Sequence, residues 1–154
     1  MTQEINYWSL IEPVCLPLNH TWDDDPDEFV RQFRSIRPEV GHLYAAYWCH
    51  EEVCNGGLFQ FFHNPTGLMA PEALEGFRAI GAAVWADVLA EAMTFFGTPY
   101  PRDWEKRIAL MPSWEDRAGG QLLFDSLDKK FFSWDDWEEV ADAYAQRLVA
   151  GRGQ

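Results

Sequence analysis

Hydrophobic positions recur every three or four residues along most of the chain, a spacing that predicts helices. The pattern is clear from Pro38 to Cys54, from Pro71 to about Phe96, and from Ser133 onward. Runs of β-branched residues are absent and alternation never lasts four residues, so no strand is expected. The sequence therefore predicts an all-α, single compact domain of about six to eight helices over residues 1–154.

Prolines predict where the first helices begin and end. Pro13 and Pro17 lack the amide hydrogen that a helix interior requires, so we expect one short helix, Gln3–Ile11, and then an extended strap within residues 1–20. Asp25 stands directly before a proline, with a glutamate three residues later, which is typical of a capped helix start. A paired glycine, Gly119-Gly120, should separate two helices in the acidic C-terminal part, residues 103–149.

A short glycine-containing segment divides the middle of the chain. Asn and Gly adopt left-handed backbone angles readily, so Asn55-Gly56-Gly57 predicts a helix end. The next residues, Leu58 to Phe62, are too apolar for a solvent-exposed loop. We expect a short buried helix or tight turn that fills the core, with Gln60 and Asn64 bonded to backbone groups that the break leaves unpaired.

The same segment belongs to a larger pattern within residues 38–96. Its members are Glu52, Asn55, Gly56, Gly57, Gln60, Phe61, Phe62, Asn64 and Gly67. Together with Ile80-Gly81 they resemble the signature of a bacterial DNA-mimic protein family, most of whose members have no assigned function. The resemblance implies that the protein competes with DNA for a partner.

Composition narrows the class of partner. The chain has 25 acidic and 12 basic residues, a formal net charge of −13 and a pI near 4.5. Such a field repels nucleic acid and anionic membranes and attracts basic protein surfaces. We therefore expect no direct binding to nucleic acid or membrane, and a basic protein surface as partner, such as that of a DNA-binding regulator; a homodimer stays open.

Cysteine usage and hydropathy predict a cytoplasmic protein. The three cysteines are an odd number without CxxC spacing, which does not suit a secreted disulfide framework. The longest apolar run, Ile80 to Ala86, is too short to span a bilayer, and no signal peptide opens the chain.

Several residues near the glycine pair could carry chemistry, and each has a simpler structural interpretation. His50 and Cys54 lie four residues apart, so they could bind a metal with His63 or Glu51, or form a base and nucleophile. Activating motifs and a fourth ligand are missing, and a small buried thiol is the simpler interpretation. Glu51 and Glu52 could form an acid/base pair, but helix neighbours point about 100° apart. We expect no catalytic residue, metal or cofactor.

The candidate binding residues are carboxylates outside the apolar stripes. They are Glu72, Glu75, Asp87, Glu91, Asp135, Asp136, Glu138, Glu139 and Asp142. Helical carboxylates three or four residues apart stand about 5–6 Å apart, close enough to approximate a row of phosphates. The sequence therefore favours a non-catalytic acidic interaction protein that mimics DNA, although acidity can also serve solubility alone.

Two alternatives stay open. One is an immunity or antitoxin protein that binds a toxin through exposed aromatics such as Trp134 or Trp137. The other is an enzyme or small-ligand binder with a polar pocket at the glycine pair. Its pocket residues would be Glu51, Glu52, Asn55, Gln60, His63 and Asn64.

Overall fold

The computed structural model describes residues 5–22 and 25–151, and these residues form eight α-helices. The helices are α1 (Tyr7–Asn19), α2 (Pro26–Ser35), α3 (Pro38–His63), α4 (Ala70–Ile80), α5 (Ala83–Met93), α6 (Trp104–Ile108), α7 (Arg117–Phe132) and α8 (Trp137–Ala150). Short 3₁₀ turns occupy Pro65–Met69, Thr94–Phe96 and Trp114–Asp116. No strand occurs in the described residues, so the predicted all-α fold is confirmed.

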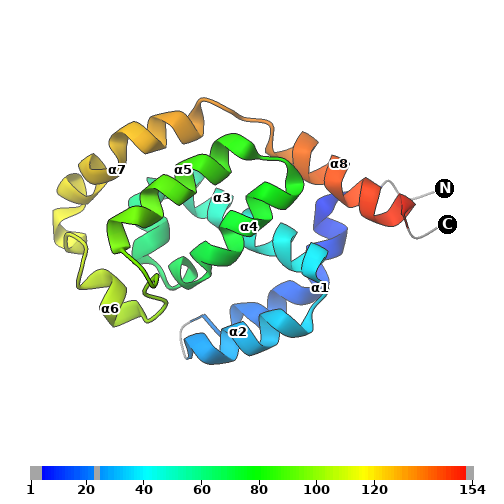
Figure 1. The fold of residues 1–154 in the computed structure, drawn as a ribbon, viewed down its shortest axis with the longest axis horizontal. Coiled ribbons are helices and arrows are strands. Elements are labelled where there is room, and N and C mark those ends of the chain that lie inside the picture. Colours follow the sequence, from blue (N-terminus) through cyan, green and yellow to red (C-terminus); the bar gives the residue numbers. More distant parts are fainter. Residues whose placement is uncertain (1–4, 23–24, 152–154) are drawn as a thin grey trace.

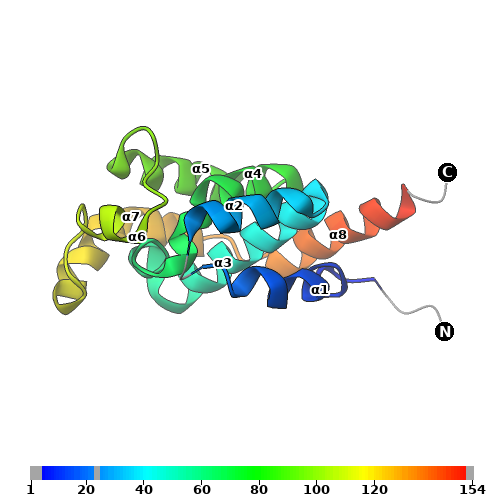
Figure 2. The same cartoon turned by 90° about the horizontal axis from the view of Figure 1, so that it is seen from below.

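Helix α3 lies at the centre of this arrangement (Figure 1). It packs most extensively against α4 and also contacts α7, α1 and α6. Figure 2 shows α4 and α5 on one side of α3 and α1 on the opposite side, next to α8. Within residues 5–22 and 25–151, no helix has the length and apolarity needed to cross a membrane.

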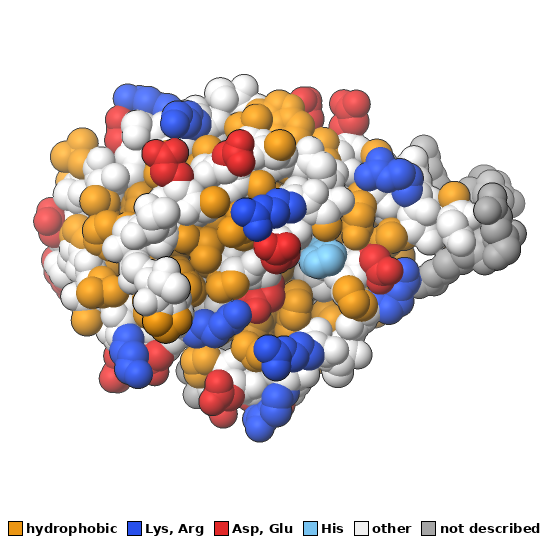
Figure 3. Space-filling model, in the orientation of Figure 1, with side chains coloured by type: hydrophobic (Ala, Val, Ile, Leu, Met, Phe, Trp, Pro, Cys, Tyr) orange, Lys and Arg blue, Asp and Glu red, His pale blue; other side chains and the backbone are white. Residues whose placement is uncertain are grey.

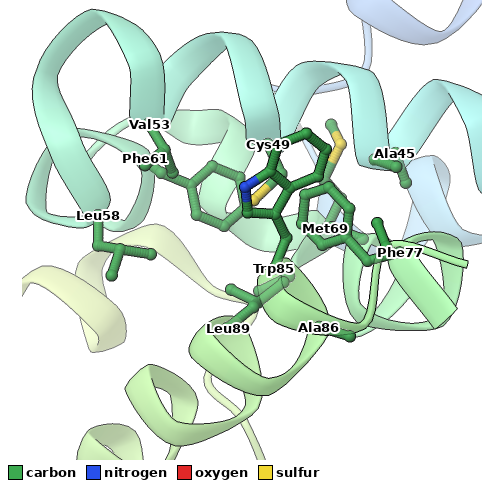
Figure 4. Packing of buried hydrophobic residues seen from close by; sticks show 14 of the residues in the cluster. Ala45, Cys49, Val53, Leu58, Phe61, Met69, Phe77, Trp85, Ala86 and Leu89 are labelled. Carbon is green, nitrogen blue, oxygen red and sulfur yellow. The ribbon is translucent and has the colours of Figure 1, made fainter. Parts of the chain in front are cut away.

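Aromatic side chains fill the space between α3 and the helices around it. Trp85 of α5 is fully buried, and its indole N–H donates to the carbonyl of Phe131 at 3.0 Å. Figure 4 shows this indole beside Cys49 and Phe61 of α3. Phe61 and Phe62 are also fully buried, which confirms that the apolar segment after the glycine pair fills the core.

Helix α3 bends at the glycine pair, where a helix end was predicted. The backbone is non-helical at Gly56 and at Gly57, whose φ of 78° favours glycine. Beyond the bend, the amide of Leu58 donates to Oδ1 of Asp128 in α7 at 2.8 Å. A carboxylate 70 residues away thus serves as the cap of the second half of α3.

The C-terminal end of α3 is closed by side chains from the region of α6. Arg107 is fully buried, and its guanidinium donates to the carbonyls of Phe62 at 2.7 Å, Asn64 at 3.0 Å and Arg102 at 2.8 Å. The indole of Trp104 donates to the carbonyl of His63 at 2.8 Å. These donors satisfy carbonyls that a helix end leaves without intrahelical partners.

The beginning of the chain differs from its prediction. Helix α1 contains both Pro13 and Pro17, so the extended strap expected within residues 1–20 is wrong over the described part. Its buried residues, Ile11, Cys15 and Leu18, lie on one helical face and join the main core. Burial of the three side chains contributes roughly 4.5–9 kcal/mol in all, comparable with the cost of two prolines at about 3 kcal/mol each.

Two further boundaries were predicted wrongly. The long helix expected from Pro71 to Phe96 is two helices, separated at Gly81, which has a φ of 85° and ends α4. The break expected at Gly119-Gly120 is absent, and both glycines lie inside α7. A Cβ on Gly120 would come within 2.2 Å of the Phe59 ring, so this glycine allows α7 to approach α3 closely.

Helix starts were predicted with mixed success. Asp25 caps α2 as expected, accepting a hydrogen bond from the amide of Asp27 at 2.9 Å. The last helix begins at Trp137 rather than Ser133, and Ser133 instead ends α7, where its amide and its hydroxyl both donate to the carbonyl of Lys130. Asp135 and Asp136 therefore precede α8 instead of lying on it.

Candidate functional site

The signature residues build a hydrogen-bonded cluster around one carboxylate. Glu52 accepts from the side-chain amides of Gln60 at 2.7 Å and Asn64 at 2.9 Å, and from the Thr66 hydroxyl at 3.0 Å. The prediction that Gln60 and Asn64 bond to backbone groups at the break is therefore wrong. Glu52 has a structural role, because it ties the segments on both sides of the bend together.

Glu51, the neighbour of Glu52, lies in an open acidic groove instead. This groove has a volume of about 700 Å³ and is lined by Tyr7, His50, Glu51, Asp135, Asp136, Trp137, Glu138 and Glu139. Among the described residues, no Lys or Arg forms an ion pair with its five carboxylates. Four of the five stand at the N-terminal end of α8, where the helix dipole stabilises negative charge.

The other predicted carboxylates are placed differently. Glu72 accepts two hydrogen bonds from Arg102, at 2.7 and 2.8 Å, and Glu75 pairs with Arg78 at 2.7 Å. Glu91 pairs with Lys130 at 3.6 Å, Asp142 accepts from the amide of Tyr7 at 2.8 Å, and Asp87 is exposed on α5. Figure 3 shows the face of the molecule on which α4 and α5 lie, and Lys and Arg side chains are mixed there with Asp and Glu. The structure thus brings together only the four carboxylates nearest the start of α8.

His50 and Cys54 are in contact, but their environment does not activate the thiol. The sulfur of Cys54 lies 3.5 Å from Nε2 of His50, and Nδ1 of His50 lies 3.4 Å from Glu51. Partial burial, followed by the carboxylates of Glu51 and Asp135, raises the pKa of Cys54 to about 11. Burial among Trp85, Phe131 and Trp137 lowers the pKa of His50. At neutral pH both groups are therefore uncharged, which does not suit a thiolate nucleophile.

The residues proposed for metal binding or a polar pocket are spread over different places. His63 lies against Trp104 and Trp114, at the end of α3 remote from His50. In the part of the chain that the structure describes, no three His, Cys, Asp or Glu side chains are placed to hold a metal. A hollow of about 640 Å³ does lie at the bend, but of the six predicted pocket residues only Asn55 lines it.

The tryptophans expected to face a toxin are mostly covered. Trp137 is only 5 % exposed and packs against Tyr7, Tyr47 and His50. Trp134 is partly buried against Trp85. Neither side chain offers a large apolar contact surface, so the expectation that Trp134 or Trp137 is an exposed contact residue is wrong.

Comparison with known proteins places the chain in a family. A family model described as DMP19-like protein matches residues 34–149, from the end of α2 almost to the end of α8. The chain belongs to the DMP19-like protein family. No curated protein and no solved structure matches this DMP19-like chain.

This assignment corrects the resemblance drawn from the sequence. That resemblance was to a family defined by a DNA-mimic signature, whereas the matching model is described only as DMP19-like. The match also continues well past Phe96 and includes the residues of α6, α7 and most of α8. In this DMP19-like protein the signature residues are chiefly structural, because they form the bend, the Glu52 cluster and part of the core.

Sequence reasoning missed part of the acidic groove. Glu51 was considered as an acid/base candidate, a metal ligand and a pocket residue but not as part of the acidic surface, and Tyr7 was not considered at all. Both lie far from α8 in the sequence, so local patterns could not connect them with Glu138. The pairing of Glu51-Glu52 in a helix gave the only signal: neighbours about 100° apart must face different surroundings.

Proposed function

We propose that this DMP19-like protein is a non-catalytic cytoplasmic protein that binds a basic protein surface and occupies it in place of DNA. The observation that supports this most directly is the acidic groove, where five carboxylates face one hollow without a described Lys or Arg partner. Each of these carboxylates can accept hydrogen bonds from an Arg or Lys that would otherwise contact a phosphate.

The arrangement of the groove favours competition with nucleic acid over general solubility. Asp135, Asp136, Glu138 and Glu139 lie within five successive positions, so their charges act on the same partner region. Asp136 directly precedes α8, and Glu138 and Glu139 lie in its first turn, so negative charge is concentrated at one helix end as it is along the phosphates of DNA. Because the groups are exposed, binding should weaken as salt screens them.

Competition with DNA can be tested on proteins that bind DNA. The fraction of a bacterial extract retained on DNA-cellulose is passed over the immobilised protein at roughly 50 and 300 mM salt. We expect retention at low salt, release by added duplex DNA, and little retention at high salt.

Two charge variants make this test specific. The variant D135N/D136N/E138Q/E139Q should lose retention, whereas E12Q/D27N/E105Q/E115Q, which removes the same charge from exposed sites elsewhere, should keep it. Equal loss in both variants would show that net charge alone attracts the partner. Retention that duplex DNA does not displace would contradict mimicry of DNA.

A further inference from the structure

The acidic groove continues into two other hollows. A hollow of about 240 Å³ shares His50 and Asp135 with the acidic groove. It also shares Cys54 and Phe132 with the hollow of about 640 Å³ at the bend of α3. The three hollows therefore lie next to one another along α3, beside α7 and the start of α8, and together they are called the extended groove.

The two ends of this extended groove differ in chemistry. At the bend of α3 the lining includes Leu122, which is 75 % exposed, and Phe132, which is 50 % exposed. The charges there are already engaged, because Asp125 pairs with Lys129 at 2.7 Å and Asp128 accepts from the amide of Leu58. The bend end is thus apolar with little free charge, and the α8 end is strongly acidic.

We propose that the extended groove binds one amphipathic basic helix of the partner protein. Charge complementarity places the Lys and Arg side chains of that helix at the acidic end, and its apolar side chains against Leu122 and Phe132. The eleven residues from Leu122 to Phe132 span about 15 Å of α7, which is roughly three turns of a bound helix. This inference rests on the proposed function and adds that the partner is recognised by an apolar anchor as well as by charge.

An apolar anchor has a measurable consequence for the effect of salt. Coulombic attraction between exposed groups falls as ionic strength rises, whereas burial of apolar surface does not. A partner held by charge alone is released at high salt, while an amphipathic helix keeps part of its affinity. The anchor also restricts which basic proteins are bound, because a basic segment without apolar residues leaves Leu122 exposed.

The test uses three synthetic helical peptides of about 14 residues. The first carries Arg at one end and Leu at helical spacing at the other. The second has Gln in place of each Leu, and the third has Gln in place of each Arg. Fluorescence anisotropy of the labelled peptides should show that the wild-type protein binds the first at least about tenfold more tightly than either of the others.

Leu122→Ser should weaken binding of the first peptide about tenfold and leave the second within about twofold. Leu16→Ser is the matched control, because Leu16 is 73 % exposed on α1 and lies outside the groove, and it should change neither affinity. If Leu122→Ser and Phe132→Ser both leave the first peptide within about twofold of wild type, the inference is overturned.

The same peptides separate this inference from the proposed function. D135N/D136N/E138Q/E139Q should weaken binding of both Arg-containing peptides at least about tenfold. If the acidic variant loses binding but the Leu122 variant does not, the acidic interaction stands and the apolar anchor is wrong. If the acidic variant binds like wild type, or if wild type binds neither Arg-containing peptide, both proposals fail.

Discussion

Glu51 and Glu52 are adjacent in the sequence, yet they belong to regions of opposite character. Glu52 is held by three side-chain donors and joins the two halves of α3 to the turn that follows. Glu51 faces an open groove with four other carboxylates and has only the weakly basic His50 beside it. The comparison shows that an acidic residue of this protein can serve the fold or remain without a basic partner, depending on which side of α3 it faces.

The largest loss of stability is expected on substitution of Arg107, the buried cation at the C-terminal end of α3. Arg107→Met removes the donors to the carbonyls of Phe62 and Arg102, and leaves the carbonyl of Asn64 with the Gly67 amide alone. Each buried group left unsatisfied costs about 1–3 kcal/mol, so the free energy of unfolding should fall by at least about 2 kcal/mol. Urea denaturation followed by circular dichroism measures it, and a loss below about 1 kcal/mol would contradict this role.

Substitution of the two neighbouring glutamates tests the comparison directly. Glu52→Ala leaves the amides of Gln60 and Asn64 without their acceptor and should lower the free energy of unfolding by about 2–3 kcal/mol. Glu51→Ala should change it by less than about 0.5 kcal/mol, because Glu51 is exposed. Similar losses in both variants, measured by urea denaturation, would remove the distinction between the two regions.

The fold was predictable where one periodic pattern decided it. The start of α3 at Pro38 was predicted correctly from the spacing of hydrophobic residues, and α8 was predicted as a helix, although its start was placed four residues too early. Gly81 was placed inside one long helix, because a spacing of three or four cannot distinguish an interior position from a cap. Gly120 was predicted to break a helix. The structure instead requires glycine there because α7 packs closely against Phe59 of α3, a contact that local sequence does not reveal.

The site was less predictable than the fold. The carboxylates near the start of α8 were found because acidity off an apolar stripe is visible in the sequence. Glu72 looked equivalent, but Arg102, 30 residues away, neutralises it. Local patterns contain no information about such long-range ion pairs, nor about the approach of Tyr7 to the groove.

A smaller change in stability should accompany the protonation of His50, which lines the acidic groove. Its pKa is lowered by burial, so the unfolded chain binds this proton at a higher pH than the folded chain does. The unfolded state therefore gains protons first as the pH falls below about 6.5, and stability decreases. His50→Asn should reduce the slope of stability against pH between about 5 and 6.5.

His63 needs a separate control, because burial and then Arg107 lower its pKa as well. His63→Asn should reduce the slope by its own share, and the double variant should show the sum. An unchanged slope in His50→Asn would contradict the assignment of a lowered pKa to this imidazole.

The smallest expected effect is on the reactivity of the Cys54 thiol, and the stability of the fold should not change. A pKa of about 11 at Cys54, against 9.0 for an unperturbed thiol, reduces the thiolate fraction at pH 8 about a hundredfold. Alkylation by iodoacetamide, followed by mass spectrometry, should therefore be much slower than for a free cysteine peptide. The double substitution Glu51→Gln and Asp135→Asn should accelerate it, because both carboxylates raise this pKa. A rate equal to that of the peptide would show that the thiol is not perturbed.

The hydrogen bond from Leu58 to Asp128 also has a consequence for the order in which the chain folds. The second half of α3 takes its cap from a residue 70 positions later, so its hydrogen bonds cannot be complete until that residue is present. During synthesis, the most recognisable part of the sequence must wait until α7 has emerged before it reaches its final shape.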